Sequence, residues 1–252
     1  MIPLLPAASW REFRGTPPKT GTNQTVHLAT VEDGTGKLHR CYVKMCPSHW
    51  MTPITESVAW ILSAELSLPR PQFAALILVP LDKLSKHLKL DQHWLGQPQA
   101  LAFCASAVDG KSPTQGWQWL APLRTKRMFK RPEIARIAAF DLWADNQDRN
   151  TSNVLIERSG NCIPIDNEFI LYRALWEGKY SFSISLRTLL QESKLRLSLT
   201  EYQRFTVEMG SQAKFHQTAF ALAKTKSQQL VNTLLPDPVQ ASSSCDLIWS
   251  HL

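Results

Sequence analysis

Three polar residues in the middle of the chain have the types and the spacing that phosphoryl transfer requires. Asp148 is followed by Asn153 five residues later and by Asp166 thirteen residues after that. A kinase uses one carboxylate to orient the attacking hydroxyl, and an amide with a second carboxylate to hold Mg²⁺. We therefore predict that Asp148 is catalytic and that Asn153 and Asp166 bind the metal and, through it, ATP. Each residue alone would be an ordinary turn residue.

The segments around these residues are expected to bring them together. Two short apolar runs, 154–156 and 162–165, flank the turn signal 158–161, which predicts a hairpin. Asn153 and Asp166 would then lie at the open ends of its two arms. Pro132 is well placed to begin a helix that runs to about Trp143, so Asp148 falls in the loop between helix and hairpin.

Upstream, Lys44 and Glu56 are candidates for binding the phosphates of the nucleotide. Lys44 ends the apolar strand 38–45, where a lysine can reach bound phosphates as a point charge. Glu56 begins the next helix and could fix Lys44 by an ion pair. Taken singly, Lys44 is more often an exposed strand lysine, and Glu56 is more often a first-turn residue favoured by the helix dipole. The polar loop 14–24 has two glycines but no Gly-x-Gly-x-x-Gly, and a phosphate loop and a plain loop are both open.

The distribution of patterns predicts an α+β protein with a small β-rich N-lobe, residues 1–108, and a mainly helical C-lobe, residues 109–252. The N-lobe is expected to contain one helix and four strands, and the C-lobe an irregular segment and a long helical tail that begins at a capping box at Ser198. The expected segments are strands 27–31, 38–45, 73–81 and 100–108, helix 56–66, irregular segment 113–130, helix 198–235, and a Ser-rich end of unassigned structure.

Composition narrows the class of protein. The chain has 252 residues, a net charge of +7 and five widely spaced cysteines without a Cys-x-x-Cys pair. A disulfide framework or structural zinc site is not expected, and reduced thiols indicate a cytoplasmic protein. No run is long enough for a membrane span. A dense basic run could attract an anionic partner or could be a solvated surface; it consists of Arg124, Lys126, Arg127, Lys130 and Arg131.

With these motifs in this order, the chain resembles the HipA-like kinases and, more distantly, phosphoinositide-kinase-type catalytic cores. The carrying segments are 42–44, 55–56 with 66–71, 140–142 with 146–156, and 165–167. The resemblance implies a two-lobed, protein-kinase-like fold that binds ATP and Mg²⁺ and phosphorylates a Ser or Thr hydroxyl of a protein. It implies that 101–105, including Phe103 and Ala105, offers backbone to adenine, and that Asp141 braces the catalytic loop.

Two residues depart from the pattern of the family. Asn150 and Asn167 stand where related sequences often have histidine, and an amide cannot take up a proton near neutral pH. Three alternatives therefore stay open beside a protein kinase. They are a lipid or small-molecule kinase of the same fold, a nucleotide-binding pseudokinase or partner-binding module, and, with support from net charge alone, a nucleic-acid-binding module.

Overall fold

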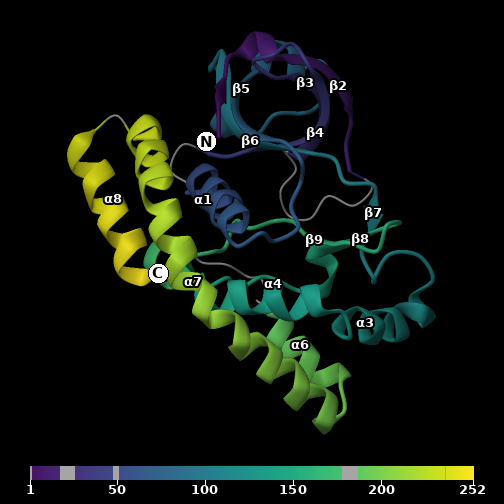
Figure 1. Cartoon of the computed structure of the whole chain (residues 1–252). Coiled ribbons are helices and arrows are strands. Elements are labelled where there is room, and N and C mark those ends of the chain that lie inside the picture. Colours follow the sequence, from purple (N-terminus) through teal and green to yellow (C-terminus); the bar gives the residue numbers. More distant parts are fainter. Residues whose placement is uncertain (1, 18–25, 48–50, 178–186, 236) are drawn as a thin grey trace. The chain divides into compact units, whose positions relative to one another are not determined.

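The computed structural model describes residues 2–17, 26–47, 51–177, 187–235 and 237–252, and it divides into two compact units. Unit 1 comprises Met1–Pro53 and Pro71–Ala107, and unit 2 comprises Ile54–Arg70 and Val108–Leu252. Unit 1 is built on a sheet, and unit 2 is mainly helical (Figure 1). The predicted α+β class, with a small β-rich part and a larger helical part, is confirmed.

Unit 1 is a six-stranded sheet that curls around an apolar core (Figure 1). The strand order is β1-β5-β6-β4-β3-β2, and only the β1–β5 pair is parallel. The four predicted strands are present, and β1 and β2 are additional. The elements are β1 (Leu4–Leu5), η1 (Ala7–Ser9), β2 (Trp10–Gly15), β3 (Val26–Glu32), β4 (Leu38–Met45), β5 (Ala74–Pro80), α2 (Leu81–Leu84), η2 (Gln92–Trp94) and β6 (Gln99–Ser106).

Strand β4 shows why the sheet has two different faces. Successive side chains of a strand point to opposite sides, so Cys41, Val43 and Met45 enter the core and are fully buried. Lys44 lies on the other face and is partly exposed. The turn before β4 is held by Asp33, whose carboxylate accepts hydrogen bonds from the backbone N–H groups of Thr35 (2.8 Å) and Lys37 (3.1 Å).

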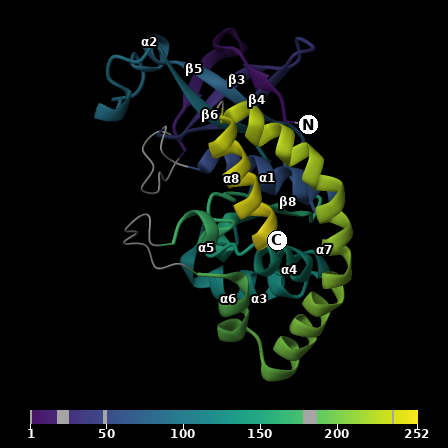
Figure 2. The ribbon, with the colours of Figure 1, turned by 90° about the vertical axis from the view of Figure 1, so that its left-hand side faces the viewer.

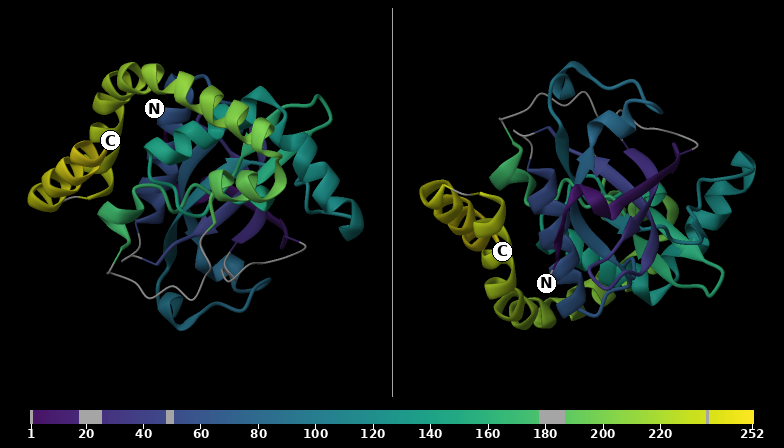
Figure 3. Two further views of the ribbon diagram at one scale, coloured as in Figure 1. Left: turned by 90° about the horizontal axis from the view of Figure 1, so that it is seen from below. Right: turned by 90° about the horizontal axis from the view of Figure 1, so that it is seen from above.

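Unit 2 consists of helices and a small antiparallel sheet of order β7-β8-β9. Helix α4 packs along α7, and α8 runs beside the C-terminal half of α7 (Figures 2 and 3). The predicted hairpin is β8–β9, with Val154 opposite Pro164. The elements are α1 (Thr52–Glu65), β7 (Gly110–Lys111), η3 (Gln118–Leu120), α3 (Ala121–Phe129), α4 (Pro132–Trp143), η4 (Thr151–Asn153), β8 (Val154–Glu157), β9 (Cys162–Pro164), α5 (Tyr172–Leu175), α6 (Leu189–Arg196), α7 (Leu199–Leu234) and α8 (Pro238–His251).

Helix α1 belongs to unit 2, although its residues were predicted to be part of the N-lobe. Polar contacts at both of its ends explain the difference. Glu56 accepts hydrogen bonds from Asn167, and the carbonyl of Leu66, just after the helix, accepts one from Arg136 at 2.9 Å. Glu65 forms an ion pair with Lys226 of α7. The boundary predicted after residue 108 therefore omits Ile54–Arg70 from the unit that contains them.

Two segments for which no helix was predicted are helical. Residues 121–129 form α3, which has Pro122 in its first turn. Lys126 and Arg127 lie in its last turn, where positive charge interacts favourably with the helix dipole. The Ser-rich end forms α8, since Asp237 accepts a hydrogen bond from the Val239 N–H (3.0 Å) as N-cap and Pro238 follows it. In the ranges that the structure describes, no helix is long and apolar enough to cross a membrane.

Candidate phosphotransfer site

The loop between α4 and β8 presents Asp148. The Asp148 N–H donates to Asn146 Oδ1 at 3.2 Å, and one carboxylate oxygen of Asp148 is 3.4 Å from Asn150 Nδ2. Asn146 in turn donates from Nδ2 to Asp141 Oδ1 at 3.0 Å. The carboxylate of Asp148 is therefore fixed on a loop whose backbone is tied to the last turn of α4, while its side chain is partly exposed.

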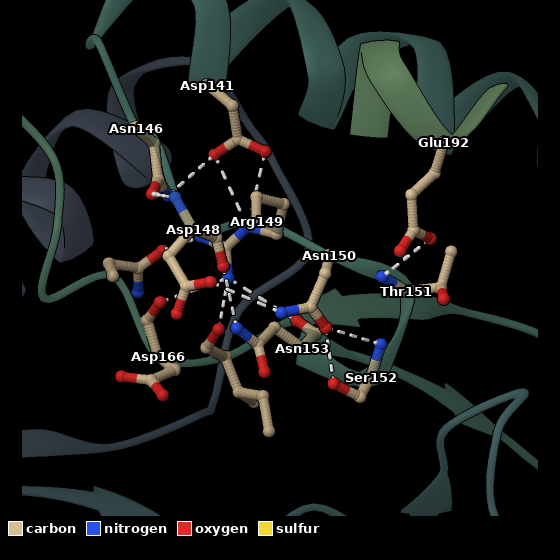
Figure 4. A network of polar contacts seen from close by, with 12 residues as sticks. Asp141, Asn146, Asp148, Arg149, Asn150, Thr151, Ser152, Asn153, Asp166 and Glu192 are labelled. Atoms are coloured by element: carbon tan, nitrogen blue, oxygen red, sulfur yellow. Dashed lines mark hydrogen bonds and ion pairs between the residues drawn. The ribbon is translucent and has the colours of Figure 1, made fainter. Parts of the chain in front are cut away.

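The fully buried side chain of Arg149 connects this loop to the hairpin (Figure 4). Its Nε is 3.2 Å from Asp141 Oδ2, which makes a buried ion pair. Its Nη1 donates to the backbone carbonyls of Asn153 (3.3 Å), Ile165 and Asp166 (3.4 Å). One guanidinium thus joins the start of β8 to the residues after β9, as the rigid array of five donors allows.

Asp141 braces the loop as the family resemblance implied. Burial raises the pKa of its carboxyl above the ordinary value, while the charge of Arg149 and the hydrogen bonds from Asn146 and Arg149 act against that rise. Removing either partner of a buried ion pair leaves an uncompensated charge, which is strongly destabilising. The pair is therefore structural, and it explains why a charged residue occupies the interior beside the candidate site.

Asn153 and Asp166 lie on one side of Arg149 and Asp141 on the other (Figure 4). Asn153 Nδ2 donates to the carbonyl of Asp148 at 2.8 Å, which leaves Oδ1 as the amide's acceptor. Asp166 is exposed and has φ of +62°, a left-handed conformation that Asp tolerates better than most residues. The hydrogen bond from Arg149 to its carbonyl helps to hold that conformation. The structure therefore brings together Asp148, Asn153 and Asp166, as the sequence predicted.

Asn167 links the hairpin to α1. Its backbone N–H and its Nδ2 both donate to Glu56 Oε2, at 3.1 and 3.3 Å, and its Oδ1 accepts from Arg149 Nη2. Glu56 is buried. An amide suits this place because it donates to a carboxylate and accepts from a guanidinium at once. The expected ion pair between Glu56 and Lys44 would join the two units, and it stays a prediction.

Asn150, the other departure from the family, caps the short helix η4. Its Oδ1 accepts hydrogen bonds from the N–H (2.9 Å) and the hydroxyl of Ser152. Glu192 of α6 accepts a further one from the Thr151 N–H at 3.2 Å. These contacts fix the short helix that ends at Asn153. Asn150 and Asn167 therefore both help to position the residues of the site.

Sequence reasoning missed Asp145 and the residues that it organises. Asp145 is buried with φ of +49°, and its carboxylate accepts from Gln147 Nε2 (2.6 Å) and the Arg173 N–H (2.8 Å). His251 Nε2 of α8 is 3.3 Å from the same carboxylate. An Asp two residues after a helix gives no signal of such partners, which lie 28 and 106 positions away in sequence. Arg149 was missed for another reason, since most of its contacts are to backbone carbonyls, which any residue can supply.

In unit 1, Lys44 lies directly opposite Phe103, and Tyr42 lies opposite Ala105. The side chains of Lys44, Phe103 and Ala105 therefore share one face of the sheet. The expectation that the backbone of Phe103 and Ala105 binds adenine does not fit the structure. Strand β6 is central, with β4 on one side and β5 on the other, so its ladder groups are already paired.

The basic run is partly engaged within unit 2. Lys126 and Lys130 both pair with Glu201 of α7, at 3.2 and 3.1 Å. Arg124 donates to the carbonyl of Trp117 (2.9 Å), and Arg131 donates to that of Gly160. Attraction of an anionic partner stays a prediction. Four of the five cations of this run therefore also make contacts within unit 2.

The chemistry of the donor set fits a hard divalent cation. An amide oxygen and a carboxylate are ligands that Mg²⁺ accepts, and Mg²⁺ takes its remaining positions from water and substrate phosphates. Across the segments that the structure describes, three or more His, Cys, Asp or Glu side chains nowhere gather closely enough for a metal site built of such ligands alone. Asn153 and Asp166 are thus suited to a metal that arrives with a phosphorylated ligand.

Comparison with known proteins gives a distant structural likeness. No family model and no curated protein matches the chain. The solved structure of an apo pseudokinase is similar over 82% of this chain and 71% of its own, at 11% identity and a TM-score of 0.36. A likeness at that level carries no argument about activity, so a function can be proposed only from the residues of this chain.

Proposed function

We propose that the protein is an ATP- and Mg²⁺-dependent phosphotransferase of the HipA-like type that phosphorylates Ser or Thr hydroxyls of a protein. The observation that carries the proposal is the network around Arg149. It positions a partly exposed carboxylate on a loop, Asp148, beside an amide and an exposed carboxylate at the two ends of a hairpin, Asn153 and Asp166. These are the three oxygen-bearing groups that phosphoryl transfer to a hydroxyl requires.

In this mechanism, Asp148 accepts the hydrogen bond of the attacking hydroxyl and takes its proton. The hydroxyl oxygen forms a bond to the terminal phosphorus of ATP, and the bond from that phosphorus to the bridging oxygen breaks to release ADP. When bound, Mg²⁺ neutralises charge on the phosphates. Asn153 and Asp166 would supply protein ligands for the metal, while Asn146 accepts from the Asp148 backbone N–H and Asn150 donates to the Asp148 carboxylate.

The residues proposed for the nucleotide lie in unit 1 and at the N-terminus of α1. Lys44 contributes a positive charge to the phosphates, and Glu56 orients Lys44. Phe103 and Ala105 contribute side chains rather than backbone to the adenine environment, because they share the sheet face of Lys44. The chain leaves β6 after Ser106, and the Ala107 N–H still donates to the Arg40 carbonyl at 2.7 Å, so residues 108 and 109 take over the role of backbone contact in this proposal.

The assignment is tested by transfer of radiolabelled phosphate from ATP to a generic protein substrate and to the protein itself. We expect Asp148→Asn and Asp166→Asn to reduce transfer by at least about 100-fold, since each removes a group that acts in the transition state. Glu208→Gln removes an exposed carboxylate of α7 outside the site and should leave the rate unchanged. Undiminished transfer by Asp148→Asn would show that this residue is not the base.

The same experiment distinguishes a protein acceptor from a lipid acceptor and from the absence of transfer. Labelling of inositol lipid in vesicles, with no labelled protein, would assign the site to a lipid kinase of the same fold. A nucleotide-dependent thermal shift without transfer to any acceptor would assign it to a nucleotide-binding pseudokinase. For the protein-kinase assignment we expect that protein is labelled, that labelling requires Mg²⁺, and that Asp166→Asn loses the labelling.

A further inference from the structure

Unit 2 exposes an apolar surface beside positive charge, at the segment that leads into α3. Trp117 and Trp119 are 69% and 72% exposed, and Leu123 is 48% exposed. The two indole rings stack on one another, with centroids 5.9 Å apart and planes at 27°. Large apolar side chains gathered on a surface mark a place of interaction more often than single ones do.

The fold holds these side chains outward. The carbonyl of Trp117 accepts hydrogen bonds from Arg124 Nη2 (2.9 Å) and from the Leu120 N–H (3.1 Å). The opposite side of α3 is buried through Thr125, Met128 and Phe129. Because the helix is anchored along that side, Leu123 cannot turn inward without unpacking α3. The exposure of this surface is therefore a property of the packed unit.

Positive charge continues the apolar surface along the same helix. Leu123, Arg127 and Lys130 are spaced four and three residues apart, which places them on one side of α3. Arg127 and Lys130 are exposed. Lys126 and Lys130 share the single carboxylate of Glu201, so the pairing leaves a net positive charge. A partner that covers this surface must present both an apolar layer and negative charge.

We propose that the surface formed by Trp117, Trp119, Leu123, Arg127 and Lys130 binds anionic lipid bilayers peripherally. Indole rings favour the membrane interface because their apolar body enters the acyl boundary while the N–H stays at the headgroups. Lys and Arg beside them attract anionic headgroups. Single-stranded nucleic acid fits less well, since bases stack on free aromatic faces and here one face of each ring is turned to the other indole. The inference does not depend on the proposed phosphotransfer activity.

Vesicle sedimentation tests the proposal. The protein should pellet with phosphatidylcholine vesicles that contain phosphatidylserine, bind much more weakly to phosphatidylcholine alone, and be released by salt, which screens exposed charges. Trp117→Ala with Trp119→Ala should lower the partition coefficient at least about tenfold, through lost apolar burial. Arg127→Gln with Lys130→Gln should lower it by roughly 25-fold, about fivefold for each cation.

Leu222→Ala with Lys224→Gln is the matched control, because it removes an exposed apolar side chain and a cation from the far half of α7. It should bind like the parent protein. Unchanged thermal unfolding by circular dichroism would show that each variant is folded. The proposal is overturned if the parent protein does not pellet with anionic vesicles, or if it binds neutral vesicles equally. It is also overturned if both surface variants bind as the control does, or if single-stranded RNA binds where vesicles do not.

Discussion

At the scale of single residues, the candidate site depends on a buried arginine. Arg149 is fully buried and contacts a helix carboxylate and the carbonyls of three residues from both ends of the β8–β9 hairpin. A buried charge is tolerated only when it is paired and its donors are used. Arg149 therefore fixes the distance between Asn153 and Asp166 without belonging to the chemistry itself.

We predict that Arg149→Met lowers the free energy of unfolding by about 3–5 kcal/mol, because Asp141 is left buried and without its cation. Arg149→Lys should also destabilise, since one ammonium group cannot reach both Asp141 and the hairpin carbonyls. Urea denaturation measures both. Arg158→Met, at an exposed arginine of the hairpin turn, is the control and should change stability by less than about 0.5 kcal/mol. A loss below about 1 kcal/mol in Arg149→Met would contradict the structural role.

Asn167 shows that a residue that departs from the family pattern can have a purely structural reason. Its amide donates to Glu56 and accepts from Arg149. We predict that Asn167→Ala lowers the free energy of unfolding by about 1–3 kcal/mol, the cost of leaving buried polar groups unpaired. Asn167→Asp should cost more, because a second carboxylate would face Glu56.

Urea denaturation also distinguishes the specific loss of the Asn167 hydrogen bonds from a general sensitivity to asparagine substitution. Asn161 donates to Glu157 at 3.0 Å on the exposed turn of the hairpin, and Asn161→Ala should be nearly neutral. If Asn167→Asp proved as stable as the parent protein, the hydrogen bonds to Glu56 would not be the reason for an amide at this position.

At the scale of elements, the packing of α4 on α7 contains a group that titrates. His216 of α7 stacks on Trp143 of α4, with centroids 4.7 Å apart and planes at 13°. Burial lowers the pKa of His216 below its ordinary value of 6.5. Below that value the unfolded chain binds a proton that the folded protein resists, so this contribution to stability is full above about pH 6.5 and declines as the pH falls.

We therefore predict that acidification from about pH 7.5 to about pH 5.5 destabilises the parent protein more than His216→Gln. The difference in free energy of unfolding between the two proteins, measured by urea denaturation at several pH values, should shrink as the pH decreases. His93 lies in the other unit and is exposed, so His93→Gln is a suitable control and should follow the parent protein. An equal slope for parent and His216→Gln would contradict the prediction.

Elements with strong local signals were predictable from the sequence. The hairpin β8–β9 and the beginnings of α4 and α7 follow from a turn signal, a proline and a capping box, each a local interaction. Helix α8 was missed because its polar, Ser-rich composition hides a helix that Asp237 and Pro238 initiate. The membership of α1 in unit 2 was missed because it depends on Glu56 and Leu66 meeting residues 111 and 70 positions away.

The candidate site also has a part that was predictable from the sequence and a part that was not. The types and spacing of Asp148, Asn153 and Asp166 predicted their convergence, because one loop and one hairpin carry all three. The contribution of Arg149 depends on carbonyl groups, which any residue can supply, so no pattern of side chains reveals it. The mistaken use of Phe103 and Ala105 has a comparable origin, since an apolar strand looks alike whether it is central or at an edge.

At the scale of the whole molecule, the proposal assigns nucleotide-contacting residues to each of the two units. Lys44 belongs to unit 1, and Asp166 belongs to unit 2. A ligand that binds only the folded protein stabilises it by about 2.7 kcal/mol at about 100 times its dissociation constant. If each unit unfolds in its own transition, a ligand held by both should raise both transitions, whereas a ligand held by one should raise one.

We predict that ATP with Mg²⁺ raises thermal stability in both units and that either Lys44→Met or Asp166→Asn removes most of the rise. Differential scanning calorimetry with and without the nucleotide measures it, and removal of Mg²⁺ by a chelator should act like Asp166→Asn. Lys37→Met and Glu208→Gln change exposed charges in unit 1 and unit 2 and should keep the full response. A response abolished by Asp166→Asn but retained by Lys44→Met would place the nucleotide on unit 2 alone and remove Lys44 from the proposed site. Loss through both variants would support the assignment of both Lys44 and Asp166 to the nucleotide.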